Sequence, residues 1–186
     1  KLRPKKGDVV LIDKNHKEFV KNSELNDIES LSKPYCYEPK EGKIIGLHNG
    51  AHFYTIGQRK GLSIGGMEKP LYVINNDVKK NIIYVGEGSN HPGLFRSVLR
   101  VSSKKIHFLS TEKQVMNKKE LKARIRYRQG LQDVSVIKKD NFYYFKFKKP
   151  QKSITRGQFI ALYQNMELIC SGVIDWKYQF DFLLNP

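Results

Sequence analysis

Cationic side chains occupy every second position of residues 121–128, and apolar or aromatic side chains lie between them. The side chains of a β-strand alternate between its two faces, so this pattern predicts a strand with one basic face and one apolar face. Neighbouring cations on such a face stand roughly 6.6 Å apart, which suits contacts with successive phosphates of one nucleic-acid backbone. Tyr127 then belongs to the apolar face, with at most its hydroxyl exposed. The cations are Lys122, Arg124, Arg126 and Arg128.

The charge of the whole chain also favours a nucleic-acid partner. Lys and Arg number 34 against 18 Asp and Glu, which gives a net charge of +16 with histidine neutral. Such an excess predicts an acidic partner, most simply nucleic acid. The net charge is +11 for residues 98–186 and +5 for residues 1–97, so the second half is the better candidate for the partner-facing surface. The alternative is a solvated basic surface without a partner, because an exposed cation contributes little by itself.

A second candidate site is the glycine-rich segment of residues 55–66, TIGQRKGLSIGG. Glycine lets the backbone take positive φ and lets another backbone approach closely. Gln58 can donate and accept hydrogen bonds, whereas Arg59 and Lys60 only donate, so this loop suits an anion. It matches neither GxxxxGK[ST] nor GxGxxG, and it therefore carries no nucleotide-binding fingerprint. A connection between strands with a solvated Arg-Lys tip explains the same residues.

Two further segments carry groups that could contact RNA. Gln158 follows Gly157 at the expected start of a strand, and its amide can pair with a base edge or a ribose hydroxyl. Alternatively, the Gln158 side chain only completes the hydrogen bonding of the turn. Aromatic residues and lysines alternate in residues 142–148, where Tyr144 could stack on a base. A barrel wall filled by aromatic side chains is the simpler interpretation of this segment.

The sequence gives little support for a metal site or for cysteine chemistry. The five histidines show no metal-ligand spacing, so no metal site is predicted. Cys36 and Cys170 form neither a disulfide framework nor a CxxC site, and neither has a nearby base. The setting expected from this cysteine usage is the cytoplasm, and no apolar run is long enough to cross a membrane. The chain begins at Lys1 without Met or a signal peptide, which predicts a piece of a longer protein.

The pattern of elements predicts a mainly β fold in two domains. Turn residues at 86–93 predict a boundary near residues 94–97, between a central β-rich domain (1–97) and a second domain (98–186). In the first domain, we predict a strand at 8–13, an Asn-Gly hairpin with strands at 43–47 and 52–56, and a second hairpin with strands at 71–75 and 81–85. Residues 17–32 show a partial helical pattern.

The second domain is predicted to be a small antiparallel β-barrel of about six strands. Short strand patterns follow one another at roughly even spacing, separated by turn signals such as Gly130, Pro150 and Gly157. The predicted strands are 105–109, 121–128, 133–138, 142–148, 158–163 and 168–174.

Several blocks of the sequence resemble, in the same order, a known family. They cover most of residues 42–174 and resemble the bacterial tRNA-specific 2-thiouridylases (the MnmA/TrmU family). The chain departs from the family at Ser63, where glycine is frequent, and at Cys170 and Ser171, which replace glycines. Residues 16–41 look like an insertion relative to shorter members of the family. The blocks are 48–52 (HNGAH), 55–62 (TIGQRKGL), 70–73 (PLYV), 81–86 (NIIYVG), 91–94 (HPGL), 124–129 (RIRYRQ), 154–158 (ITRGQ) and 171–174 (SGVI).

The resemblance implies the tRNA-binding part of an enzyme that transfers sulfur to C2 of the wobble uridine of tRNA. In that family an N-terminal ATP-pyrophosphatase domain uses ATP and magnesium, and a cysteine pair there receives persulfide sulfur from a sulfur-relay donor protein. Its SGGxDSS loop and its catalytic cysteines have no match here, so this piece alone is expected to be inactive. The resemblance points to Arg126, Tyr127 and Gln158 as tRNA contacts. Our hypothesis for Arg59 and Lys60 is that they lie nearer the catalytic domain and help close the site around a flipped base.

Two other functions remain open. One is a non-catalytic RNA-binding or ribosome-associated barrel without a lost enzyme domain. The other is a protein-interaction module whose surface is merely basic.

Overall fold

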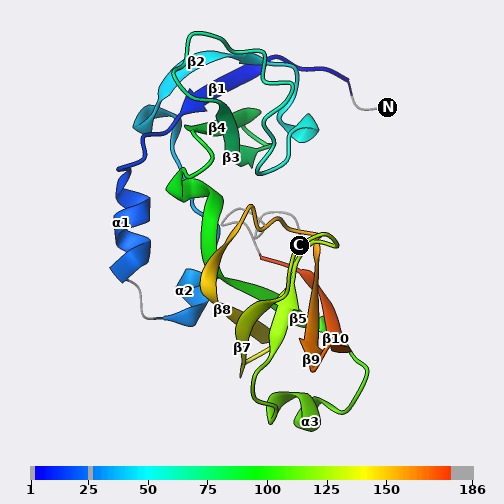
Figure 1. Ribbon diagram of the computed structural model, residues 1–186. Coiled ribbons are helices and arrows are strands. Elements are labelled where there is room, and N and C mark those ends of the chain that lie inside the picture. The colour runs from blue at the N-terminus through cyan, green and yellow to red at the C-terminus, as the bar shows by residue number, and fades with distance from the viewer. Residues whose placement is uncertain (1–2, 25–26, 177–186) are drawn as a thin grey trace. The chain divides into compact units, whose positions relative to one another are not determined.

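The structure is a computed structural model that describes residues 3–24 and 27–176 (Figure 1). It divides into two compact units. The first comprises the described residues of Lys1–Leu25 and Tyr35–Arg96, and the second those of Asn26–Pro34 and Ser97–Pro186. Each unit has a hydrophobic core of its own. Residues 177–186 of the predicted second domain lie outside the described residues.

The first unit is built on a four-stranded sheet in the order β2-β1-β4-β3. β1 pairs antiparallel with β2 and parallel with β4, and β3 pairs antiparallel with β4. β4 is buried over most of its length because apolar clusters cover both faces of the sheet. The strands are β1 (Gly7–Leu11), β2 (Lys43–His48), β3 (Leu71–Asp77) and β4 (Ile82–Glu87), and the helices are α1 (Lys17–Glu24) and the 3-10 helices η1 (Pro39–Glu41), η2 (Ala51–Phe53) and η3 (Pro92–Leu94).

One of the two hairpins predicted for this unit is confirmed and the other is wrong. β3 and β4 form the second predicted hairpin, and Asp77 accepts a hydrogen bond from the Lys80 amide in its turn. The Asn-Gly hairpin does not form, because β2 pairs with β1 and the chain after it enters η2. A residue distant in sequence explains the difference: the Asn81 side chain accepts a hydrogen bond from the Ala51 amide at 3.0 Å.

The second unit is a closed barrel of six strands in the order β10-β5-β8-β7-β6-β9. The predicted mainly β fold with an antiparallel six-stranded barrel is thereby confirmed. The partial helical pattern within residues 17–32 becomes α1 and α2, which belong to different units. The barrel strands are β5 (Phe95–Phe108), β6 (Lys122–Arg124), β7 (Gln132–Lys139), β8 (Phe142–Lys152), β9 (Phe159–Gln164) and β10 (Glu167–Ile174), with the helices α2 (Ile28–Leu31) and α3 (Glu112–Met116).

The alternation of β8 fills the barrel as predicted. Tyr143, Phe145 and Phe147 are buried in the core of the barrel. Tyr144 points to the opposite face but is only 2% exposed, and α2 lies against this strand. Base stacking on Tyr144 is therefore excluded, and the interpretation as a barrel wall is confirmed.

Three features of the barrel differ from the prediction. β6 ends at Arg124, so the strand predicted for residues 121–128 is too long. β8 continues through Pro150, which was expected to mark a turn. The unpredicted helix α3 begins at a capping box, in which Thr111 and Gln114 each accept a hydrogen bond from the other's backbone amide.

Two buried histidines hold turns of the first unit in the same way. Nδ1 of His48 accepts a hydrogen bond from the Gly50 amide, and Nδ1 of His91 accepts one from the Gly93 amide. Nε2 of each ring lies 3.1–3.2 Å from a backbone carbonyl. Each ring is therefore needed in its neutral form, with the proton on Nε2.

The stability of the first unit is expected to fall in mild acid. Burial lowers the pKa of both His48 and His91 below the usual 6.5. The unfolded chain thus binds more protons, so the stabilisation is complete above about pH 6.5 and is lost as the pH falls from there through the lowered folded pKa values. Urea unfolding between pH 5 and pH 7.5 measures this loss. His48→Gln and His91→Gln should flatten the pH dependence, and the exposed His107→Gln should leave it unchanged.

Candidate nucleic-acid interface

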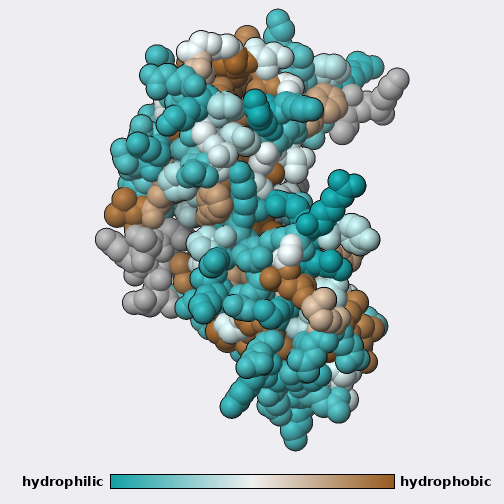
Figure 2. Space-filling view, viewed as in Figure 1, coloured by the Kyte–Doolittle hydropathy of each residue, from teal (hydrophilic) through white to brown (hydrophobic). Residues whose placement is uncertain are grey.

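Hydrophilic side chains cover most of the molecular face drawn in Figure 2, with apolar side chains scattered among them. The predicted site residues of the barrel lie where β6 leaves the barrel and where β9 enters it. Arg124 on β6 pairs with Ala161 on β9, so the turn after β6 and the turn before β9 lie at the same end of the barrel. Arg126 joins them, since its Nη2 donates to the carbonyls of Lys152 and Ser153 at 3.0 and 2.8 Å.

The turn after β6 is fixed by side chains on both sides of it. Arg124 donates to the Tyr127 carbonyl at 3.1 Å and to the Tyr163 hydroxyl at 2.8 Å. Gln129 accepts a hydrogen bond from the Ile125 amide and donates one to the Gln151 side chain. The Arg126 guanidinium is partly enclosed, and burial lowers its pKa, although an arginine stays charged near neutral pH. These hydrogen bonds hold the chain in a turn, so β6 does not continue beyond Arg124.

The turn after β6 places the Tyr127 side chain outside the barrel. The Tyr127 side chain is 86% exposed, so its predicted inward position is wrong. Nor do the four cations form an evenly spaced row. Lys122 pairs with Asp133 at 3.2 Å, Arg124 and Arg126 bind groups of the barrel itself, and Arg128 is exposed on the turn. The result is an exposed aromatic ring on a cationic turn that its own hydrogen bonds hold in place, and we call this turn, residues 125–130, the braced turn. It replaces the predicted row of phosphate contacts along a strand.

The turn before β9 holds Gln158 by its backbone alone. The Gly157 amide donates to the Ile174 carbonyl at 2.9 Å, and the Ile174 amide donates to the Gln158 carbonyl at 2.8 Å. Gly157 has φ +85°, which favours glycine at this position. Oε1 of Gln158 is enclosed and receives no hydrogen bond from the described residues. The Gln158 side chain can therefore turn toward a ligand without losing a partner for this oxygen.

The glycine-rich loop of the first unit contains the same turn. The Gly57 amide donates to the Val73 carbonyl at 2.7 Å, and the Val73 amide donates to the Gln58 carbonyl at 2.9 Å. The sequence signal is Thr-x-Gly-Gln at both 55–58 and 155–158, a repetition that was not among the predicted features. Here both ends of the glutamine amide are engaged, because Gln58 accepts from the Thr55 amide and donates to the Lys60 carbonyl.

Arg59 and Lys60 are exposed at the tip of this loop. They belong to the first unit, whereas the other predicted site residues belong to the second. The loop borders an open hollow of about 570 Å³, lined by Arg59 and residues 61–71. Gly65 and Gly66 have no atom within 4 Å of an added Cβ, so this wall of the hollow is open to a partner.

Comparison with known proteins assigns both parts of the chain. Residues 25–87 match the family "tRNA methyl transferase PRC-barrel domain", and residues 98–174 match the "Aminomethyltransferase beta-barrel domain". Relatives described as tRNA-specific 2-thiouridylase MnmA are 42% identical in Christiangramia forsetii and 46% identical in Karelsulcia muelleri, and each alignment covers 94% of this chain. A relative of the same description in Pseudomonas aeruginosa is 36% identical over 81% of the chain.

The chain belongs to the tRNA-specific 2-thiouridylase family. It spans 46% of the length of the Christiangramia forsetii relative and 44% of the Karelsulcia muelleri relative. The family resemblance stated from the sequence blocks is thus confirmed.

The described part of the chain does not fit a metal or a reactive thiol. Residues 3–24 and 27–176 contain no group of three or more His, Cys, Asp or Glu side chains that could hold a metal ion. Burial raises the pKa of Cys170 to about 12 and raises the pKa of Cys36 as well, which disfavours the thiolate that sulfur chemistry needs. No helix among these residues has the length and apolar character needed to cross a bilayer.

Proposed function

We propose that this chain is the tRNA-binding part of a tRNA-uridine 2-sulfurtransferase that thiolates the wobble uridine of the anticodon in the cytoplasm. The observation that supports it most is the braced turn that exposes Tyr127 at the same barrel end as Gln158. Membership of a family whose relatives are described as tRNA-specific 2-thiouridylases supports tRNA as the partner.

In this proposal the barrel end binds RNA through three kinds of contact. The exposed ring of Tyr127 stacks on an unpaired base, a contact available to any base. The Gln158 amide turns outward and pairs with a base edge or a ribose hydroxyl. Arg128, and the part of the Arg126 guanidinium that does not face the carbonyls, neutralise phosphates and set the register. Arg124 orients the turn.

Sulfur transfer itself is assigned to a part of the whole protein outside this chain. That part would use ATP and magnesium to activate the uridine oxygen, and it would take persulfide sulfur from a sulfur-relay protein. This chain holds the tRNA so that the target base reaches that site. Arg59 and Lys60 face the catalytic domain and help close it around the base. The chain alone is expected to form no 2-thiouridine when incubated with tRNA, ATP, magnesium and a persulfide donor, as measured by nucleoside mass spectrometry.

Filter binding of unmodified tRNA across a range of salt concentrations tests the proposed interface. Wild-type affinity should fall steeply with salt, because cations of the barrel release counterions from the phosphates. A Tyr127→Ala/Gln158→Ala double variant that binds like the wild type would exclude this barrel end. An absence of RNA binding even at low salt would favour the protein-interaction module instead.

A comparison of Arg128→Gln with Arg126→Gln is expected to separate the loss of a phosphate contact from the loss of the hydrogen bonds that hold the braced turn. Each removes one cation, so each should reduce the steepness of the salt dependence by about 0.7–0.9 in log–log slope. Arg126→Gln should also lower the free energy of unfolding by about 1 kcal/mol for each carbonyl hydrogen bond lost. Urea unfolding should show no such change for Arg128→Gln. Equal stability of both variants would contradict the bracing role of Arg126.

A further inference from the structure

The outer face of β8 carries two cations that the proposed contacts at the barrel end do not use. Phe145 and Phe147 point into the core of the barrel. Because side chains alternate along a strand, Lys146 and Lys148 point outward, and both are exposed. They stand roughly 6.6 Å apart along the strand. β8 therefore carries, in shorter form, the row of cations that was predicted for residues 121–128.

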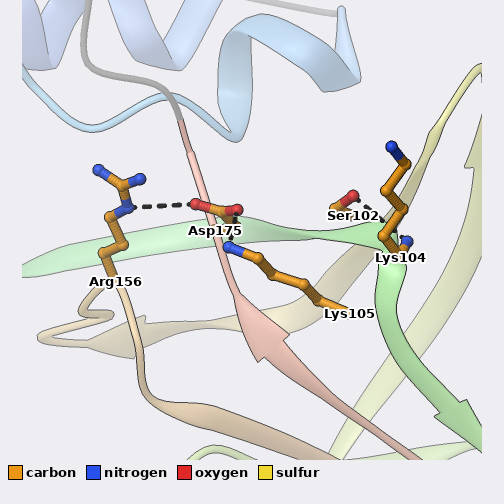
Figure 3. Close-up of polar contacts among 5 residues, drawn as sticks. All are labelled: Ser102, Lys104, Lys105, Arg156 and Asp175. Carbon is orange, nitrogen blue, oxygen red and sulfur yellow. Dashed lines mark hydrogen bonds and ion pairs between the residues drawn. The ribbon is translucent and has the colours of Figure 1, made fainter. Parts of the chain in front are cut away.

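Several cations of the barrel are neutralised by an acid, but these two lysines are not. Asp175, for example, lies 2.7 Å from Nζ of Lys105 and 3.1 Å from Nε of Arg156 (Figure 3). Within the part of the chain that the structure describes, no carboxylate forms an ion pair with Lys146 or Lys148. Their ammonium groups are thus available to an anion from outside the chain.

The strand beside β8 leaves this surface positive. Ser135 on β7 pairs with Lys146 and is neutral. Asp133, two residues before Ser135, already binds Lys122 of β6 at 3.2 Å. Three lysines and one aspartate therefore give this part of the barrel wall a net charge of +2. We call Lys146 and Lys148 the lysine pair.

The helix α2 does not cover the lysine pair. Glu29 of α2 lies 3.7 Å from Nζ of Lys139, and Lys139 pairs with Phe142 at the start of β8. Tyr144 is only 2% exposed, whereas the lysine pair beyond it is exposed. The helix α2, which lies against β8, thus occupies the beginning of its outer face and leaves the continuation open.

The far end of β8 is joined to the braced turn. Gln129 of that turn donates a hydrogen bond to the Gln151 side chain on β8. Lys148 and Lys146 precede Gln151 by three and five residues. At about 3.3 Å per residue, they lie roughly 10 and 17 Å along the strand from this contact. The outer face of β8 therefore leads from the lysine pair toward the turn that carries Tyr127.

The stability of the barrel does not explain the lysine pair. Like charges at this spacing repel each other, and lysine is depleted in strands. Lysines often protect the free edge of a sheet from unwanted pairing. However, β8 lies between β5 and β7 in a closed barrel and has no free edge. Contact with a polyanion accounts for the pair, because each phosphate that a lysine neutralises releases a counterion.

We infer that the lysine pair contacts successive phosphates of the RNA strand whose base stacks on Tyr127. This inference rests on the proposed function of the barrel. Such contacts hold the strand in register without reading its sequence. A stacked strand advances about 3.4 Å per nucleotide, so Lys146 and the braced turn are about five nucleotides apart. The bound RNA therefore follows the wall of the barrel as well as its end.

Removal of both charges tests the phosphate contacts. Lys146→Gln/Lys148→Gln should weaken the binding of unmodified tRNA and lower the log–log salt slope by about 1.4–1.8, or about 0.7–0.9 for each cation. The matched control is Lys113→Gln/Lys119→Gln, which removes two exposed lysines from the segment before β6. The braced turn follows β6, so this control changes the opposite end of the barrel and should leave the slope nearly unchanged.

Tyr127→Ala separates this inference from the proposed function. If the lysine-pair variant binds like the control variant while Tyr127→Ala weakens binding, the inference is overturned and the proposed function stands. If the lysine-pair variant weakens binding while Tyr127→Ala binds like the wild type, the Tyr127 site is overturned, and the inferred course of the strand is overturned with it.

Cross-linking tests the course of the RNA strand directly. In a Cys36→Ser background, which removes the exposed thiol, Ser135→Cys places a thiol beside the lysine pair and Arg128→Cys places one beside Tyr127. Each thiol is labelled with a photoactivatable aryl azide, and the cross-linked nucleotides of unmodified tRNA are mapped by primer extension. The two sets of nucleotides should lie on one strand within about five nucleotides of each other. Cross-links from Ser135→Cys to a distant part of the tRNA, or none at all, would overturn the inference.

Discussion

Tyr127→Ala is expected to weaken the binding of unmodified tRNA by roughly 5- to 140-fold. This range corresponds to about 1–3 kcal/mol for the loss of one base–aromatic stack. The Tyr127 ring is 86% exposed, so its removal leaves no cavity in the barrel. The free energy of unfolding should therefore change by less than about 0.5 kcal/mol. Filter binding and urea unfolding of the same samples measure the two effects.

Two variants control for this result. Tyr127→Phe keeps the ring and should bind tRNA nearly as well as the wild type. Phe53→Ala removes an exposed aromatic ring from the first unit and should have little effect on binding. Equal affinity of Tyr127→Ala and Phe53→Ala would show that Tyr127 does not stack on RNA.

Phe145→Ala is expected to lower the free energy of unfolding of the barrel by about 3–5 kcal/mol. The Phe145 ring is fully buried in the barrel core, and its truncation loses burial and leaves a cavity. Phe159→Ala is the matched control, because it removes the same ring from the same barrel at a position that is 64% exposed. This control should change stability by less than about 0.5 kcal/mol.

Urea unfolding followed by circular dichroism measures both phenylalanine variants. Losses of similar size at the two positions would contradict the assignment of inner and outer faces. The comparison is informative because the two substitutions remove the same atoms, so only the surroundings of the rings differ.

Local alternation was sufficient to predict the barrel. In β8, aromatic residues at every second position fill the core, although Pro150 lies within the strand instead of ending it. The hairpin of β3 and β4 was equally predictable, because its strands and its turn are formed by one continuous segment of the chain. These features depend on residues that are neighbours in sequence.

The exposed turn of the candidate site could not be predicted from the same pattern. Alternation continues to Arg128, but the strand ends at Arg124 because side chains bind partners far along the chain. Gln129 pairs with Gln151, and Arg126 reaches the carbonyls of Lys152 and Ser153. Gly130 was a local signal for a turn, although it did not show how early the turn begins. The failed Asn-Gly hairpin has the same cause, a bond to the distant Asn81.

The repeated Thr-x-Gly-Gln turn gives the chain a pair of spectroscopic reporters. Gln58 and Gln158 occupy the same backbone geometry, but only Gln58 has both ends of its amide engaged by its own loop. In a heteronuclear NMR spectrum, the side-chain NH₂ signals of Gln58 should exchange slowly with solvent and stay in place during a titration. Those of Gln158 should exchange faster and shift when RNA is added.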